Sequence, residues 1–87
     1  MAGYRIVFRK SVAKDLRRIP PQDVGKVLRR ISALADDPRP AGAEKLSTQE
    51  RYRARQGVYR ILYEIADEQL IVTVVKIGHR REVYRSG

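Results

Sequence analysis

The chain has 87 residues, the size of one small domain with a modest hydrophobic core. Nineteen Lys and Arg residues against ten Asp and Glu residues give a formal charge of +9, which favours nucleic acid, an acidic protein or an anionic membrane surface as partner. The absence of cysteine excludes disulfides, thiol catalysis and cysteine-based zinc sites. No apolar run approaches the roughly 20 residues that span a bilayer, and residues 1–9 lack a secretory signal, so we expect a cytoplasmic protein without a membrane segment.

The N-terminal half predicts one strand and two helices. Residues 4–9 alternate apolar with mostly basic side chains, the pattern of a short strand with one half-buried face. Ser11 suits the N-cap of a first helix, which the proline pair 20–21 ends. A second helix begins there and ends before Pro38. Its apolar residues follow the i, i+3, i+4, i+7 spacing and predict one buried stripe: Val24, Val27, Leu28, Ile31, Leu34 and Ala35.

The C-terminal half predicts a three-stranded antiparallel meander. Residues 38–50 contain prolines, a glycine and small polar residues, which indicates a loop. Segments 51–56, 58–66 and 69–77 contain many Val, Ile and Tyr residues and are separated by turn residues. The expected fold is a single α+β domain over residues 1–87. It has an N-terminal strand, an antiparallel two-helix hairpin and the meander, with the helices packed on one face of the sheet.

Several basic residues share one face of the predicted sheet, because alternate side chains of a strand point the same way. On the strand over residues 51–56, Tyr52 and Ala54 suit the core, which leaves the intervening arginines on the opposite face. Covering one face with helices therefore leaves four basic residues from three strands on the other: Arg53, Arg55, Arg60 and Lys76. Arg80 and Tyr84 follow directly after the last strand, so folding can bring them to the same place.

These residue types suit phosphodiester chemistry on RNA. A single histidine excludes a two-histidine ribonuclease site, and the sequence has no metal-ligand cluster, phosphate loop or nucleophile elbow. The ribose 2′-hydroxyl can serve as internal nucleophile, so the protein must chiefly stabilise charge on the phosphate, which arginine does with paired hydrogen bonds. Nearby arginines lower the pKa of a tyrosine, which makes Tyr84 a candidate base and an arginine a candidate acid. His79 could share the proton transfer.

Each assignment has a structural alternative. The strand arginines could form a solvated surface on which Arg60 pairs with Glu64, an interaction worth only about 0–1 kcal/mol when exposed. The C-terminal arginines could be a plain basic tail with Tyr84 packed on the sheet edge. His79 could be a spacer or a phosphate contact rather than the principal base.

Three segments resemble the RelE branch of the RelE/ParE toxin superfamily: residues 52–55 (Tyr-Arg-Ala-Arg), 57–63 (Gly-Val-Tyr-Arg-Ile-Leu-Tyr) and 78–84 (Gly-His-Arg-Arg-Glu-Val-Tyr). The likeness covers nearly the whole chain and includes the Lys45-Leu46 pair. It implies a toxin that cleaves mRNA in the ribosomal A site without a metal or other cofactor. It also implies a RelB-like antitoxin as partner, in a hetero-oligomeric toxin–antitoxin complex.

The resemblance assigns catalysis to five residues: Arg53, Arg55, Arg60, Arg80 and Tyr84. We expect four more to contact the RNA: Lys45, Lys76, His79 and Arg81. The best-known pattern has lysines where this chain has Arg53 and Arg55, and its segment between the positions of Arg80 and Tyr84 is longer. Two alternatives stay open, a ParE-like inhibitor of DNA gyrase that cleaves no RNA, and a basic nucleic-acid-binding module without catalysis.

Overall fold

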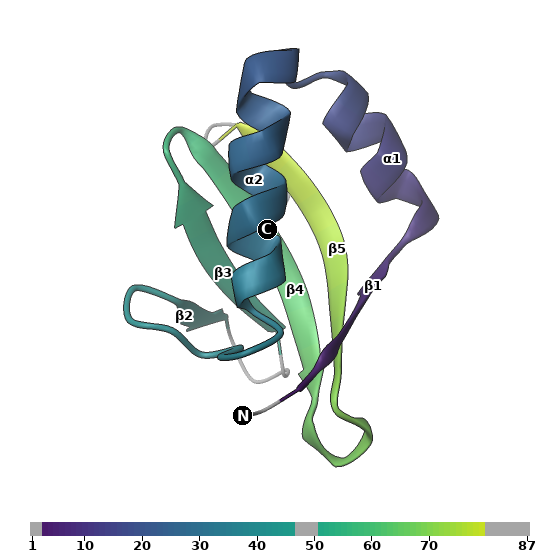
Figure 1. The fold of residues 1–87 in the computed structure, drawn as a ribbon, viewed down its shortest axis with the longest axis vertical. Helices are drawn as coiled ribbons and strands as arrows, with labels where there is room; N and C mark the ends of the chain where they lie inside the picture. Colours follow the sequence, from purple (N-terminus) through teal and green to yellow (C-terminus); the bar gives the residue numbers. More distant parts are fainter. Residues whose placement is uncertain (1–2, 47–50, 80–87) are drawn as a thin grey trace.

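The computed structural model describes residues 3–46 and 51–79, in which helices cover one face of a five-stranded sheet (Figure 1). The elements, in chain order, are β1 (Arg5–Phe8), α1 (Lys10–Arg17), α2 (Pro21–Ala33), β2 (Glu44–Leu46), β3 (Arg51–Gln56), β4 (Tyr59–Ala66), the 3₁₀ helix η1 (Asp67–Gln69) and β5 (Ile71–His79). The predicted α+β class, with the helices on one side of the sheet, is confirmed.

The two helices run in opposite directions along the sheet, α1 packing chiefly on β5 and α2 on β3 (Figure 1). Pro21 occupies the first turn of α2, as predicted, because a proline there forfeits no intrahelical hydrogen bond. The N-cap of α1 is Arg9 and no side chain caps this helix, so the prediction of Ser11 as N-cap is wrong. Leu28 also departs from the predicted stripe, since it lies at the margin of the buried face and is 38% exposed.

The sheet is mixed, with the strand order β1-β5-β4-β3-β2. β1 lies parallel to β5, while the other neighbouring strands are antiparallel. The prediction of an unbroken loop over residues 38–50 is wrong, because the three residues of β2 pair with β3. A strand this short has too little alternation to stand out beside prolines and a glycine. The pairing matters for the site, because it places Glu44 directly opposite Arg53.

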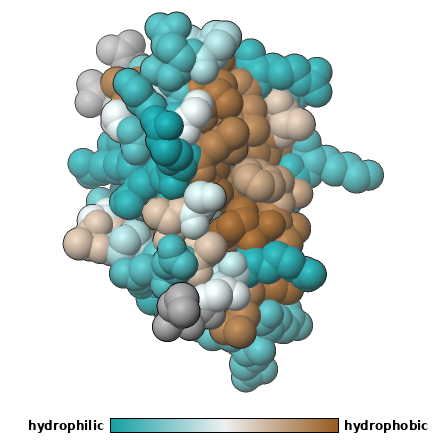
Figure 2. All heavy atoms as spheres, viewed as in Figure 1, coloured by the Kyte–Doolittle hydropathy of each residue, from teal (hydrophilic) through white to brown (hydrophobic). Residues whose placement is uncertain are grey.

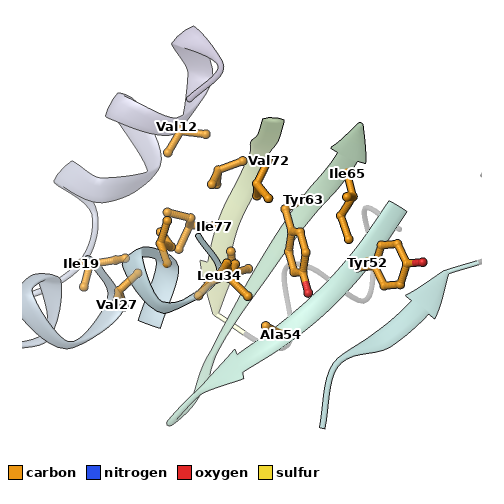
Figure 3. Close-up of a cluster of buried hydrophobic side chains, with 13 residues drawn as sticks. Val12, Ile19, Val27, Leu34, Tyr52, Ala54, Tyr63, Ile65, Val72 and Ile77 are labelled. Atoms are coloured by element: carbon orange, nitrogen blue, oxygen red, sulfur yellow. The ribbon is translucent and has the colours of Figure 1, made fainter. Parts of the chain in front are cut away.

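The helix-facing side of the sheet forms the core. Tyr52 pairs with Tyr63, and Ala54 pairs with Ile61, so these side chains lie toward the helices. The register shifts between Leu62 and Tyr63, which inserts one extra residue into β5 and leaves the alternation of its two faces intact on either side. Figure 3 shows side chains of both helices meeting this face. The largest fully buried side chains are those of Val12, Val27, Ile31, Leu34, Ile61, Tyr63, Val72, Val74 and Ile77.

The central tyrosine of the core carries a satisfied polar group. Tyr63 is fully buried, and its hydroxyl donates to the carbonyl oxygen of Pro38 at 2.7 Å. Its ring stacks on that of Tyr52 with the centroids 5.8 Å apart. Burial raises the pKa of Tyr63 to about 12, so the phenol remains protonated at neutral pH. The loop after α2 is thereby fixed to the sheet.

A cluster of polar contacts holds the same loop to the turn between β4 and β5. The Arg39 guanidinium donates to both carboxylate oxygens of Asp67, at 3.0 and 2.8 Å, and its Nε donates to the Tyr52 hydroxyl at 3.0 Å. The Tyr4 hydroxyl donates to Asp67 at 2.6 Å. These donors, Arg39 first, lower the pKa of Asp67 to about 2. The chain leading into β2 is therefore anchored before it reaches Glu44.

Within the described residues, neither helix is long and apolar enough to cross a membrane.

Candidate nucleic-acid interface

The sheet face turned away from the helices carries most of the predicted strand residues in two adjacent rows. The first row crosses four strands through Glu44, Arg53, Leu62 and Lys76. The second row crosses three strands through Arg55, Arg60 and Gly78. Paired residues of neighbouring strands point to the same side of a sheet. The register therefore brings four predicted residues, from β3, β4 and β5, to one face.

The arginines of this face differ in exposure. The side chain of Arg55 is 57% exposed and that of Arg53 is 14% exposed, whereas Arg60 is buried at 5%. The prediction placed Arg60 on the correct face, but its expected position on an open surface needs correction. β4 is a central strand, so Arg60 lies between two neighbouring strands, paired with Arg55 of β3 on one side and with Gly78 of β5 on the other. Arg55 is consequently the arginine that a large ligand meets first.

A carboxylate lies among these arginines. The Glu44 Oε2 atom accepts a hydrogen bond from Arg53 Nη2 at 2.6 Å, and its Oε1 atom lies 3.4 Å from Arg55 Nη2. The pKa of Glu44 is held below its usual value, mainly by the hydrogen bond from Arg53 and then by the charges of Arg53, Arg55 and Arg60. Three arginines from two strands therefore act on a single anion. This arrangement fits a site for an anionic group.

Sequence reasoning missed Glu44. Residues 38–50 were expected to form a loop, and a loop residue has no defined face. The Glu-Lys-Leu run at 44–46 gives no clear alternation, because Glu44 and Lys45 are both exposed and the half-buried Leu46 shares the face of Glu44. Its register with β3 depends on contacts that are not local in sequence.

A second acidic residue on the same face belongs to a separate cluster. Glu64 accepts from Arg51 Nη2 at 2.8 Å and from Arg9 Nη2 at 3.3 Å. Register places Glu64 opposite Arg51, one row beyond Arg53. Among the described residues, the face thus has two acid–arginine groups, and the group around Glu44 contains two of the predicted catalytic residues, Arg53 and Arg55.

Two other predicted RNA-binding residues lie on the helix side of the sheet. Lys45 pairs with the core residue Tyr52, and His79 pairs with Tyr59. The His79 and Tyr59 rings meet edge to face with their centroids 6.4 Å apart. His79 lines a hollow of about 320 Å³ together with residues of α1 and β5, including Asp15. The structure therefore does not bring Lys45 or His79 to the arginines. The three remaining predicted residues, Arg80, Arg81 and Tyr84, lie outside the described residues.

The helical side of the molecule carries an apolar groove. Figure 2 shows a band of hydrophobic atoms on this side, bordered by hydrophilic ones. The groove has a volume of about 370 Å³ and forms where α1, the end of β1 and α2 meet. Its apolar lining consists of Phe8, Val12, Ala13, Leu16 and Leu28, and Arg9 and Lys10 complete it. Phe8 was predicted on the half-buried face of its strand, yet it is 43% exposed at this groove.

Known proteins with this sequence pattern and fold identify the family. The model of the "ParE toxin of type II toxin-antitoxin system, parDE" matches residues 6–84. Toxin RelG of Mycobacterium tuberculosis is 31% identical, over 94% of this chain and 97% of that protein. The solved toxin–antitoxin complex RelBE2 of Mycobacterium tuberculosis matches with a TM-score of 0.79 and 28% identity, over 90% of this chain and 99% of that chain. The archaeal RelE–RelB complex of Pyrococcus horikoshii matches with a TM-score of 0.77 and 25% identity, over 90% of this chain and 96% of that chain. The chain therefore belongs to the RelE/ParE superfamily, the toxins of type II toxin–antitoxin systems.

Proposed function

We propose that this toxin is an endoribonuclease that cleaves mRNA in the ribosomal A site and so inhibits translation. The contacts of Arg53 and Arg55 with the Glu44 carboxylate, together with the position of Arg60 directly opposite Arg55, carry the proposal. A carboxylate held by guanidinium groups has the charge and hydrogen-bonding pattern of a phosphate diester, which also presents two oxygens to donors. The scissile phosphate of the mRNA binds at this position.

The arginines stabilise the transition state of a transesterification. The ribose 2′-oxygen attacks phosphorus, the bond to the 5′-oxygen breaks, and the products are a 2′,3′-cyclic phosphate and a 5′-hydroxyl. Negative charge grows on the phosphate oxygens during this step, and Arg53, Arg55 and Arg60 offset it. Because Arg60 is buried, its charge is less screened by water than an exposed one. No metal is required for this step, since the RNA supplies the nucleophile.

Proton transfer falls to the C-terminal segment. Tyr84 removes the proton of the 2′-hydroxyl or stacks on a base, and Arg80 binds the phosphate or protonates the leaving 5′-oxygen. Both groups have high ordinary pKa values, so the free protein is a slow catalyst. The ribosome compensates for the slow catalysis by holding the mRNA with its 2′-oxygen positioned to attack phosphorus. The toxin therefore requires ribosome-bound mRNA, which it meets in the cytoplasm.

The partner that restrains this activity is a RelB-like antitoxin. Two solved structures of related toxins are complexes with antitoxins, and the present chain has an apolar groove on its helices and a formal charge of +9. An antitoxin with an acidic, amphipathic segment complements both features. It wraps the helices and a sheet edge and covers the arginine face, in a hetero-oligomeric complex.

Gyrase inhibition is the second candidate function, because the matching family model is that of the ParE toxin. ParE-like and RelE-like toxins share their fold, so the fold does not separate the two activities. The arginine cluster around Glu44 favours RNA cleavage, since inhibition by binding alone does not require two guanidinium groups on one anion with a third arginine, Arg60, beside them.

The decisive experiment adds the purified toxin to ribosomes programmed with a defined mRNA and maps the new 5′ ends. We expect cleavage within the A-site codon, and its loss in Arg55→Ala and in Arg80→Ala. Arg29→Ala, which removes the same charge from the exposed side of α2, serves as the matched control and retains cleavage. Uncut mRNA, together with stalled gyrase and DNA breaks in a parallel supercoiling assay, would establish the second candidate instead.

A further inference from the structure

Glu44 occupies the position that the proposed function assigns to a phosphate. Its two carboxylate oxygens face different guanidinium groups, those of Arg53 and Arg55, at 2.6 and 3.4 Å. A phosphate that takes the same Nη2 donors competes with Glu44 for them. It also meets like-charge repulsion if the carboxylate stays in place.

The local structure allows Glu44 to leave. It lies on β2, a three-residue strand at the edge of the sheet, and its side chain is 45% exposed. A carboxylate that is already partly in water loses little by rotating outward, because it gains hydration as its ion pairs break. Arg53 is only 14% exposed, so an incoming anion that binds its Nη2 atom must take over the donor that Glu44 now holds.

The second acidic cluster of this face supplies a natural comparison. Glu64 neutralises Arg51 and Arg9, neither of which belongs to the proposed phosphate site. Neutralising Glu64 changes the net charge by the same amount as neutralising Glu44, but it frees different arginines. A difference between the two variants therefore reports the local role of Glu44 rather than the total charge.

We infer that Glu44 is a built-in counter-ion that weakens the binding of RNA phosphate at Arg53 and Arg55 and must be displaced before RNA is held there. The inference rests on the proposed function in taking RNA as the ligand. Its consequence is selectivity. Free RNA, which offers phosphates in many geometries, displaces Glu44 poorly, whereas RNA fixed on the ribosome delivers one phosphate at high local concentration.

The test measures binding of a short single-stranded RNA with 2′-O-methyl riboses, which cannot be cleaved, by fluorescence anisotropy at several salt concentrations. We expect Glu44→Gln to bind about five- to tenfold more tightly than the wild type at low salt, the scale of one removed unit charge at contact distance in water. The slope of the logarithm of the association constant against the logarithm of the salt concentration should steepen by about 0.7, the change expected for one additional phosphate contact on single-stranded RNA. Glu64→Gln should change the affinity less than about twofold, since Glu64 contacts Arg51 and Arg9 rather than Arg53 or Arg55, and salt screens its charge at the greater distance.

Equal gains in Glu44→Gln and Glu64→Gln, or no gain in Glu44→Gln, would overturn the inference. Circular dichroism verifies that each variant is folded. If Glu44→Gln fails to fold, Glu44→Asp offers a second variant, which retains the charge but draws the carboxylate back from both Arg53 and Arg55. It should bind RNA at least about twofold more tightly than the wild type, and an unchanged affinity would contradict the inference. The binding assay uses uncleavable RNA, so its result does not depend on catalysis. If Glu44→Gln binds RNA more tightly but the toxin leaves mRNA on ribosomes uncut, the proposed function is refuted and this inference stands.

Discussion

Replacing Tyr63 by Phe tests the polar contact at the centre of the core. The substitution retains the ring and its stacking on Tyr52 but removes the hydroxyl that donates to the Pro38 carbonyl at 2.7 Å. A buried acceptor that loses its donor costs about 1–3 kcal/mol. For a domain of this size, each kcal/mol lowers Tm by about 4–8 °C. Urea unfolding at pH 7, followed by far-UV circular dichroism, should show a loss within that range.

The same substitution predicts a characteristic pH dependence. Burial raises the pKa of Tyr63 from 10.0 to about 12, so above pH 10 the unfolded chain releases a proton that the folded chain retains. The stability that Tyr63 contributes is therefore fully present below pH 10 and is lost as the pH rises toward 12. At pH 11 the wild type should have lost about 1.4 kcal/mol through this group, and Tyr63→Phe none. Other titrating groups are common to both proteins and cancel in the difference.

The stability gap between wild type and Tyr63→Phe should consequently narrow by about 1.4 kcal/mol between pH 7 and pH 11. A gap that stays constant over this range would refute the assignment of Tyr63 as a buried, preferentially protonated phenol. A gap below about 0.5 kcal/mol at pH 7 would refute the hydrogen bond to Pro38 as a stabilising contact.

Four further substitutions test the sheet, its turns and helix α2. Asp67→Asn should destabilise the fold at pH 7, because Arg39 loses its ion pair. The stability difference between wild type and Asp67→Asn should disappear as the pH falls from 3.8 through about 2, because wild-type Asp67 is then itself protonated. Thermal melts of both proteins at pH 7 and near pH 2 check this. Gly57 has φ +59, so Gly57→Ala should lower the free energy of unfolding by about 1–2 kcal/mol through backbone strain alone. Gly25→Ala in α2 should instead raise it by about 0.5–1 kcal/mol, and urea titrations of the two variants compare these effects. Leu62→Ala should cost about 2–5 kcal/mol in the same assay, because Leu62 is buried on the arginine face, and a cost typical of a surface residue would contradict that burial.

The parts of the fold that depend on local pattern could be predicted from the sequence. The helical stripe, the proline boundary between the helices and the three meander strands each depend on the spacing of a few neighbouring residues. The parallel pairing of β1 with β5 could not be predicted, because the residue pattern of a strand does not determine which strand it pairs with. β2 could not either, since three residues carry too little alternation and gain their strand conformation from β3.

The candidate site divides in the same way. Alternation alone predicts which face Arg53, Arg55 and Arg60 occupy, and the register of the structure agrees. The burial of Arg60 depends on neighbours from two other strands, and the role of Glu44 depends on a strand pairing, so neither is visible locally. His79 shows the limit of reasoning from a motif, because strand register turns it toward α1 rather than toward the arginines.

The most direct test of the central claim is to observe the guanidinium groups while RNA binds. Nitrogen-15 NMR spectra of the Arg Nε–Hε groups should be recorded as uncleavable 2′-O-methyl RNA is added. If one phosphate binds among Arg53, Arg55 and Arg60, the signals of these three residues should shift together with a single dissociation constant, while those of Arg51 and Arg29 stay nearly fixed. Shifts confined to the helix arginines, or spread evenly over all arginines, would contradict a phosphate site on this face of the sheet.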